Sequence, residues 1–353
     1  MNIDEIINSI DSNNLDIAFG RVVNISAVTL SAVGLDVAVG DIVRIESAQK
    51  LYTVLGMVTV LNDDMFVIVP FSFIDGFKIN DKVFLQRDGL TIKCGNGLLG
   101  RVVNALGEPI DDLGKIRDLD TNAPINKESM SPLDRGIIDQ KFATGVKAID
   151  SMLTCGKGQK VGIFAGSGVG KSTLMGMIVQ GCEATIKVIA LVGERGREIP
   201  EFIHYNLNNN LEKTVIVTAT SDESPLMRKY AAFTAMTIAE YFRDKGYDVL
   251  LMMDSVTRFA MAQREIGLST GEPPVSRGYP PSVFALLPQL MERAGNSKKG
   301  SITAFFTVLV DGDDLNDPIA DQSRSILDGH IVLTRDLTEQ GFYPPINILK
   351  SAS

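Results

Sequence analysis

Residues 165–173 combine glycines, a lysine and hydroxyl side chains in an arrangement that suits the binding of phosphate groups. In chain order the segment consists of Ala165, Gly166, Ser167, Gly168, Val169, Gly170, Lys171, Ser172 and Thr173. It matches the Walker A phosphate loop, except that alanine stands where the strict pattern has its first glycine. Glycines let consecutive backbone N–H groups point at phosphate oxygens, Lys171 adds a positive charge, and Ser172 offers a hydroxyl to Mg²⁺. We therefore expect this segment to bind a nucleotide; the alternative is a glycine-rich turn that binds none.

Two carboxylates follow apolar runs farther along the chain. Asp254 ends the run 249–253, and Glu194 lies in the charged turn after the run 187–192. The carboxyl ends of parallel strands meet at one edge of a sheet, where ligands bind. We therefore expect Asp254 to join Ser172 in holding Mg²⁺, and Glu194 to orient or deprotonate water at the γ-phosphate. The alternatives are that Asp254 only caps a helix and that Glu194 is a solvated carboxylate.

The elements that must position these residues alternate between apolar runs and helical stretches. From residue 159 onward, strand-like runs occupy 161–164, 187–192, 214–218, 248–253, 302–310 and 331–333. Such alternation is typical of a parallel sheet with helices on its faces, so we predict an α/β fold. A helix should begin at Pro225, because Ser224 can cap it and Gly246 follows its last turn.

The earlier part of the chain has a different pattern. Short β-prone runs at 19–23, 41–45, 52–60, 65–69 and 82–85 are separated by turn residues, which predicts a small β-barrel. Several glycines and prolines between 97 and 139 indicate a connecting segment with tight turns. The predicted domains are therefore a β-barrel at 13–90, a connecting segment at 91–140 and the nucleotide-binding α/β domain at 141–353.

Residues 1–12 predict a short helix that precedes the barrel. Ile3, Ile6, Ile7 and Ile10 recur at helical spacing and would form one apolar stripe. A helix this short needs support from packing. The stripe either packs on its own domain or docks on a partner, and we expect a partner-binding helix.

Composition excludes several classes of protein. Hydrophobic residues make up 45% of the 353 residues and charged residues 22%, as in ordinary folded proteins. No apolar run approaches the roughly 18 residues that span a bilayer, and no signal peptide is evident, so a cytoplasmic location is expected. The cysteines Cys94, Cys155 and Cys182 suit neither a disulfide framework nor a zinc site. A net charge of −9 argues against a nucleic-acid partner.

These features resemble the catalytic subunits of F/V-type rotary ATPases, and more closely the type III protein export ATPases. The resemblance covers nearly the whole chain, including GVKAID (145–150), GER (193–195), SDESPLMR (221–228) and PPSVF (280–284). The segments DSVTRFAMAQREIG (254–267) and ITAFFTVLVDGDD (302–314) look flagellar rather than injectisome-like. The resemblance implies a RecA-like P-loop core with a mostly parallel sheet, preceded by the barrel. It also implies an Mg-dependent ATPase coupled to flagellar protein export, which delivers and unfolds or releases export substrates at the membrane export gate.

Further site residues and partners are implied only by this resemblance. Glu194 would be the hydrolytic base, Arg195 and Arg258 would be cations beside the phosphates, and Tyr343 would stack on adenine, unless it only covers the edge of the core. The cofactors would be ATP and Mg²⁺. The implied partners are other copies in a homohexameric ring, a stator protein on the N-terminal helix, a central coiled-coil stalk protein, the export gate, chaperones and export substrates. The protein would work at the inner face of the membrane.

Family members continue past Ser353 with an arginine and a helical C-terminal domain, so the resemblance predicts a truncated chain that is a poor ATPase and largely monomeric. Three other functions remain open at this point. The first is a virulence injectisome export ATPase. The second is a non-catalytic nucleotide-binding subunit, which would carry glutamine in place of Glu194. The third is a ring-shaped RNA translocase, which the acidic balance disfavours.

Overall fold

The computed structural model describes residues 18–47, 52–310 and 317–353. They divide into two compact units, Met1–Gly89 and Leu90–Ser353, each with its own hydrophobic core. The predicted helix at 1–12 and its isoleucine stripe lie outside the described residues.

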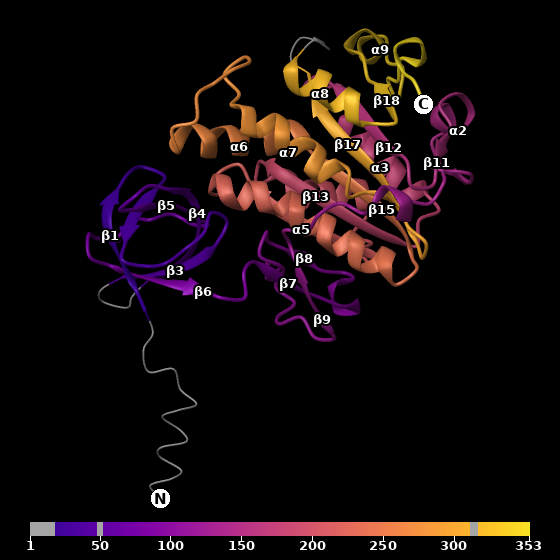
Figure 1. Ribbon diagram of the computed structural model, residues 1–353. Helices are drawn as coiled ribbons and strands as arrows, with labels where there is room; N and C mark the ends of the chain where they lie inside the picture. The colour runs from indigo at the N-terminus through magenta and orange to yellow at the C-terminus, as the bar shows by residue number, and fades with distance from the viewer. Residues whose placement is uncertain (1–17, 48–51, 311–316) are drawn as a thin grey trace, which may run out of the picture. The chain divides into compact units, whose positions relative to one another are not determined.

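The first unit is a closed barrel of antiparallel strands (Figure 1). Its strands are β1 (Gly20–Ile25), β2 (Leu30–Val33), β3 (Ile42–Glu46), β4 (Thr53–Leu61), β5 (Phe66–Pro70) and β6 (Lys82–Gln86). They pair in the order β1-β2-β5-β4-β3-β6, and β6 closes the barrel onto β1 where Val83 lies opposite Gly20. Alternate apolar side chains fill the interior, as a small barrel requires. The predicted N-terminal β-barrel is therefore confirmed.

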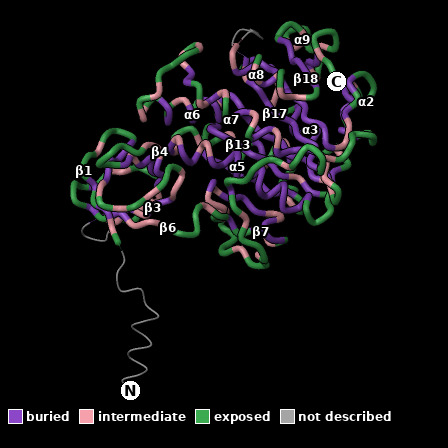
Figure 2. Tube along the Cα trace, viewed as in Figure 1, coloured by how far each residue is buried: buried purple, intermediate pink, exposed green. Residues whose placement is uncertain are grey.

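The second unit contains a mostly parallel sheet, as the alternating pattern predicts. Its strands run in the order β18-β12-β17-β15-β13-β14-β8. Their bounds are β18 (Gly329–Val332), β12 (Lys160–Ala165), β17 (Ser301–Leu309), β15 (Asp248–Asp254), β13 (Ile186–Glu194), β14 (Thr214–Thr220) and β8 (Val102–Val103), while β16 (Gly295–Asn296) pairs antiparallel with β17. The central strands are buried on both faces (Figure 2), which explains their continuous apolar sequences.

Helices pack on this sheet and connect its strands. They are α2 (Lys147–Met152), α3 (Lys171–Gly181), α4 (Glu198–Glu201), α5 (Pro225–Asp244), α6 (Val256–Ser269), α7 (Pro281–Met291), α8 (Pro318–Ile326) and α9 (Arg335–Glu339). Helix α5 begins as predicted: the Ser224 hydroxyl accepts a hydrogen bond from the N–H of Met227 at 3.2 Å, which satisfies one of the free donors of the first turn. α5 packs against β13, β14 and β15. Beyond β18 the described residues form only α9 and a short turn, η5 (Ile348–Lys350), and contain no helical C-terminal domain.

The segment between the barrel and the phosphate loop is built into the second unit. It contains the turns η1 (Asn96–Leu98) and η2 (Pro132–Asp134) and the small sheets β7 (Thr91–Cys94) with β9 (Thr121–Pro124) and β10 (Lys141–Phe142) with β11 (Cys155–Gly156). β8 joins the main sheet beside β14, with Val102 opposite Ile216. Arg293, which is 1% exposed, donates to the Ile125 carbonyl at 2.9 Å and pairs with Glu240 of α5 at 2.7 Å. These contacts hold the segment against α5.

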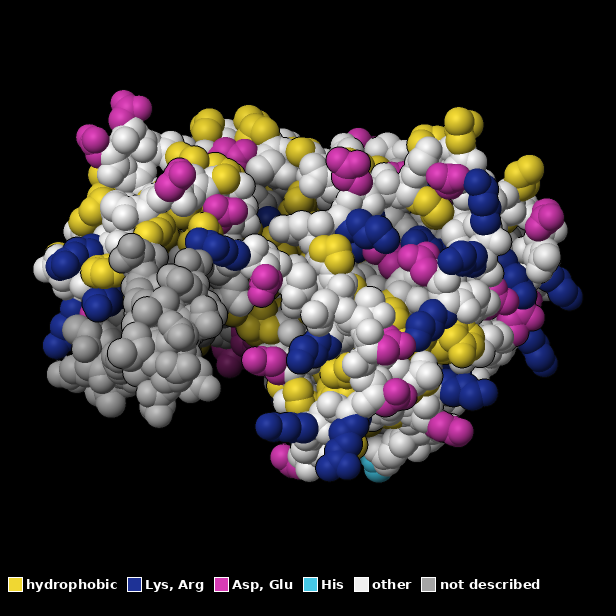
Figure 3. All heavy atoms as spheres, turned by 60° about the horizontal axis from the view of Figure 1, so that its bottom comes forward, with side chains coloured by type: hydrophobic (Ala, Val, Ile, Leu, Met, Phe, Trp, Pro, Cys, Tyr) yellow, Lys and Arg dark blue, Asp and Glu magenta, His cyan; other side chains and the backbone are white. Residues whose placement is uncertain are grey.

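Charged side chains of both signs are interspersed over the face of the second unit shown in Figure 3. One exposed pair is Lys298 and Asp134, whose charged atoms are 2.6 Å apart. Exposed pairs of this kind contribute little to stability, so the buried core carries the fold. Within the described residues, no helix combines the length and the apolar character that crossing a bilayer requires.

Candidate functional site

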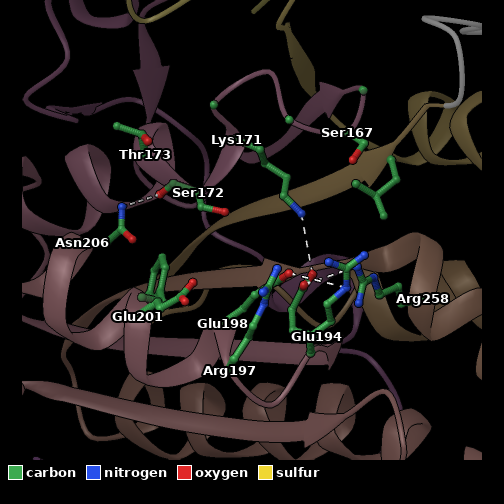
Figure 4. Close-up of a pocket in the computed structure, with 16 residues that line it drawn as sticks. Ser167, Lys171, Ser172, Thr173, Glu194, Arg197, Glu198, Glu201, Asn206 and Arg258 are labelled. Atoms are coloured by element: carbon green, nitrogen blue, oxygen red, sulfur yellow. Dashed lines mark hydrogen bonds and ion pairs between the residues drawn. The ribbon is translucent and has the colours of Figure 1, made fainter.

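Four neighbouring strands end at one edge of the main sheet, and the candidate residues come from these ends. Ala165 of β12 lies opposite Leu309 of β17, and Asp254 of β15 lies opposite Leu191 of β13, shortly before Glu194. A cavity of about 510 Å³ opens at this edge (Figure 4). Its lining comprises Gly166, Ser167, Gly168, Gly170, Lys171, Ser172, Thr173, Glu194, Arg195, Arg197, Glu198, Glu201, Phe202, Asn206, Arg258 and Leu309. Most of the predicted site residues therefore share one cavity.

The phosphate loop joins β12 to α3 in a conformation that needs glycine. Gly168 and Gly170 have φ angles of 77° and 94°, in the left-handed region that favours glycine. A methyl group at Gly170 would also overlap the Tyr343 hydroxyl. The loop leads directly into the first turn of α3, whose backbone N–H groups have no partner within the helix and attract anions.

The carbonyl groups of the loop have partners outside the cavity. Ala165 O accepts from the N–H of Val310 at 3.1 Å. Ser167 O accepts from the Arg335 guanidinium at 3.1 Å, and Val169 O accepts from the Thr338 hydroxyl at 3.4 Å. Because the carbonyls are held by neighbouring segments, the N–H groups of the same peptides face the other way, towards the cavity. Helix α9, which supplies Arg335 and Thr338, thus braces the loop from behind.

Two buried carboxyl groups and two half-buried cations meet next to the phosphate loop. The Lys171 ammonium contacts Oδ1 of Asp254 and lies 3.8 Å from Oε1 of Glu194. The Arg258 guanidinium lies 3.3 Å from Oε2 of Glu194 and donates to the Gly193 carbonyl. Figure 4 shows Lys171 reaching from the loop towards Glu194, with Arg258 beside it. Two cations and two carboxyl groups therefore meet at this point of the site.

A bulge at the end of β13 places Glu194 at the cavity. The pairing with β14 shifts register between Val192 and Glu194, and Gly193 between them has a φ angle of 68°. Bulges of this kind redirect side chains next to functional sites. Glu194 is 6% exposed, and its Oε1 has no hydrogen-bond partner among the described residues. Oε1 of Glu194 is thus available, at the cavity beside the phosphate loop, to accept a hydrogen bond from water.

The environment of Glu194 favours its neutral form. Burial raises the pKa of Glu194 to about 8, and the nearby charge of Asp254 and a hydrogen bond with Glu198 act in the same direction. The positive charges of Lys171 and Arg258 oppose this rise in the pKa of Glu194. A carboxylate whose pKa lies near the working pH can exchange a proton during a reaction.

The oxygen atoms near Asp254 suit Mg²⁺. Asp254 is 3% exposed, and its Oδ1 accepts from the Thr307 hydroxyl at 2.7 Å. Ser172 lies in the first turn of α3, and Figure 4 shows its hydroxyl directed into the cavity. No group of three or more His, Cys, Asp or Glu that could hold a metal occurs among the described residues. Mg²⁺ typically takes one or two protein oxygens and completes its shell with phosphate and water, so Ser172 and Asp254 fit this ion together with a nucleotide.

Other predicted residues lie at the rim of the cavity or outside its lining. Arg195 lines it, but its side chain is 65% exposed and lies 3.8 Å from Glu198. Tyr343 is half-exposed, with its hydroxyl beside Gly170, and is not part of the cavity lining. Ala165, Val169 and Asp254 are buried and are also absent from the lining.

The cavity also contains residues that the sequence analysis does not single out. Arg197, Glu198 and Glu201 follow Glu194 on the way into α4, and the charged run 194–201 is the signal that could have indicated them. Asn206 closes the π-helical turn η3 (Phe202–Asn206) and donates to the Ser172 carbonyl at 3.2 Å. Arg335 and Thr307 carry no comparable signal, because each reaches the site from a distant part of the chain.

Comparisons with known proteins cover most of the chain. The profile of the ATP synthase alpha/beta family, nucleotide-binding domain, matches residues 145–353. The flagellum-specific ATP synthase of Helicobacter pylori (strain J99) is 62% identical over 336 residues, which cover 95% of this chain and 77% of the relative. The assembled ATPase EscN from the type III secretion system of enteropathogenic E. coli has a TM-score of 0.89 and 48% identity, over 95% of this chain and 80% of that chain. A structure of EscN with its central stalk EscO has a TM-score of 0.87 and 47% identity over the same shares.

Proposed function

The chain belongs to the ATP synthase alpha/beta family, among its flagellar and type III secretion ATPases, and we propose that it hydrolyses MgATP to drive the export of flagellar proteins. The observation that carries the proposal is the position of Glu194. Its Oε1, which has no hydrogen-bond partner among the described residues, lies 3.8 Å from the Lys171 ammonium of the phosphate loop, and both residues line the same cavity. A subunit that only binds nucleotide has no need of a buried carboxylate at this point.

The proposed mechanism begins with a change of partner for Lys171. When phosphates occupy the loop, the ammonium moves from Asp254 to the phosphate oxygens, where it stabilises negative charge. Ser172 and Asp254 would hold Mg²⁺, which would supply positive charge to neutralise part of the charge on the phosphates. The loop N–H groups cradle the same oxygens.

Glu194 and the arginines act on the reaction itself. Glu194 positions the attacking water through Oε1 and accepts its proton, for which the ionised form is required. Arg258, 3.3 Å from Oε2 of Glu194, orients this carboxylate and stabilises charge that develops on the γ-phosphate. Arg195 is a second cation at the rim of the cavity, and Tyr343 provides a flat surface for adenine beside Gly170.

The export role rests on the relatives. A flagellum-specific ATP synthase, that of Helicobacter pylori, is 62% identical to this chain, which supports a flagellar system, while secretion ATPases such as EscN at 48% keep an injectisome as the alternative. EscN assembles and binds a central stalk protein, so we propose a ring of this chain around a coiled-coil stalk. A stator protein on the N-terminal helix, the export gate, chaperones and export substrates are the other proposed partners, at the inner face of the membrane.

Steady-state phosphate release tests the proposed enzyme. Lys171→Ala should abolish turnover and weaken nucleotide binding, because the loop loses its side-chain cation. Glu194→Gln should still bind MgATP but lose most turnover, because the amide cannot accept a proton. Unchanged turnover in Glu194→Gln would remove this residue from the mechanism, and nucleotide binding without turnover in the unmodified protein would favour a non-catalytic subunit.

A genetic test addresses the export role separately. The unmodified gene should restore motility to a strain that lacks its flagellar export ATPase, whereas the Lys171→Ala gene should not. Restoration of secretion in an injectisome mutant, but not of motility, would favour the virulence system instead.

A further inference from the structure

Thr307 lies next to Asp254, one of the two residues proposed to hold Mg²⁺. It lies on β17, the strand between the strand of the phosphate loop and the strand that ends in Asp254. It lies opposite Ile163 of β12, and its neighbour Phe306 lies opposite Met253 of β15. Thr307 is fully buried, and its hydroxyl donates to Oδ1 of Asp254 at 2.7 Å.

Asp254 Oδ1 has two donors in the nucleotide-free protein, and they differ in how easily they can leave. The Lys171 side chain contacts the same oxygen, but it lies on the phosphate loop and is required at the phosphates once a nucleotide binds. Thr307 is paired with Ile163 of β12, and its strand is flanked by β12 and β15 in the middle of the sheet. After Lys171 leaves, the Thr307 hydroxyl remains as the donor on Oδ1.

The Thr307 hydroxyl is not needed to hold the backbone in place. β17 is fixed by its ladders with β12 and β15, and the corner after Asp254 is tied to β17 by a separate contact, in which the Thr257 hydroxyl accepts from the N–H of Leu309 at 2.8 Å. The Thr307 hydroxyl therefore acts on the orientation of one carboxylate. A carboxylate held by a hydrogen bond on one oxygen presents its other oxygen in a defined direction.

We propose that Thr307 is a positioning residue that orients Asp254 for Mg²⁺, so that it sets the Mg²⁺-dependent part of nucleotide affinity. The proposal rests on the proposed function, because it assumes that the cavity binds a nucleotide with Mg²⁺. Hydrogen bonds from surrounding groups to metal-binding carboxylates commonly change metal affinity by about 10–100-fold. A role in the fold alone would instead affect nucleotide binding equally with and without the metal.

The test measures the dissociation constant of fluorescently labelled ADP by titration, once in excess Mg²⁺ and once in EDTA. Thr307→Val removes the hydroxyl at nearly constant volume and should weaken binding in Mg²⁺ roughly tenfold, with binding in EDTA unchanged. Thr307→Ser keeps the hydroxyl and should restore most of the Mg²⁺ effect. Thr303→Val is the matched control: Thr303 is 1% exposed on the same strand, and its hydroxyl accepts from the N–H of Gly158, away from the cavity.

Three results would overturn the assignment of Thr307. The first is that Mg²⁺ strengthens ADP binding equally in Thr307→Val and in the unmodified protein. The second is that Thr307→Val weakens ADP binding equally in Mg²⁺ and in EDTA. The third is that Thr303→Val weakens Mg²⁺-dependent ADP binding as much as Thr307→Val does. If Thr307→Val does not fold, Thr307→Ala and Thr307→Ser are compared, because their difference isolates the hydroxyl. An unmodified protein that binds no ADP in Mg²⁺ would overturn the proposed function as well, whereas normal Mg²⁺-dependent binding with an unaffected Thr307→Val removes only the role of Thr307.

Discussion

Replacing Lys171 with methionine should destabilise the nucleotide-free protein, although this lysine serves nucleotide binding. Its side chain is 13% exposed and contacts Asp254, whose side chain is 5% exposed. Methionine has similar length and no charge, so the substitution removes the ion pair without opening a large cavity. Asp254 would keep the Thr307 hydroxyl as a donor but would lose its cation.

The expected loss is about 2–3 kcal/mol in the free energy of unfolding at pH 7. Removing one partner of a buried ion pair costs roughly 3–5 kcal/mol, and two features place the loss at this site at or below the lower limit of that range. The remaining Thr307 hydrogen bond still solvates Asp254. The pKa of Glu194 is about 8, so this second carboxylate is largely neutral at pH 7 and needs little compensation. The loss should grow between pH 7 and pH 9, because Glu194 ionises over this range and Lys171 is one of the two cations that oppose the rise in its pKa.

Urea unfolding of the second unit, followed by circular dichroism in EDTA without nucleotide, measures this loss. The double variant Lys171→Met/Asp254→Asn should recover at least half of it, because the unpaired charge is gone. Lys298→Met is the control: Lys298 pairs with Asp134 at 2.6 Å but is 74% exposed, and it should cost well under 1 kcal/mol. A Lys171→Met variant as stable as the unmodified protein, or single losses that simply add in the double variant, would refute this account of the site.

Three further predictions concern individual residues. The ratio kcat/KM should rise roughly tenfold from pH 7 to pH 9, because Glu194, with a pKa of about 8, must be ionised to act as a base; a flat profile of phosphate release would contradict this. Arg335→Ala should raise the dissociation constant for nucleotide severalfold with little change in kcat, since the guanidinium braces Ser167, and Arg335→Lys should recover part of the loss; equal binding by all three proteins would exclude a brace. Tyr343→Ala should weaken ATP binding roughly tenfold through lost stacking yet leave tripolyphosphate binding unchanged, and a similar loss for both ligands would exclude contact with adenine.

Much of the candidate site follows from local sequence. The phosphate loop can be identified because glycines, Lys171 and Ser172 stand at fixed spacing between an apolar strand and a helix. Asp254 and Glu194 could be brought to the same edge because each follows an apolar run, and parallel strands end on the same side of a sheet. The barrel can also be predicted from the sequence, because its strands are short, alternate in polarity and are separated by turn residues.

Strand order is the first property that only the tertiary structure decides. Nothing near Val102 indicates that β8 extends the main sheet beside β14, because pairing between distant strands leaves no periodic signal in either one. The burial of the Glu194 side chain is likewise decided only by the tertiary structure. Its neighbours along the chain include charged residues, but its burial and the nearby charge of Asp254 raise its pKa to about 8.

The residues that support the site are the second such property. In the sequence, Thr307 is only one polar residue in an apolar run. In the structure, β17 lies between β12 and β15, and the Thr307 hydroxyl donates to Asp254. The sequence around Arg335 does not predict that its guanidinium donates to the Ser167 carbonyl of the phosphate loop. Residues that bind phosphate keep a recognisable spacing because they lie on one loop, whereas residues that orient them come from elements far apart in the chain and meet only after the sheet has formed.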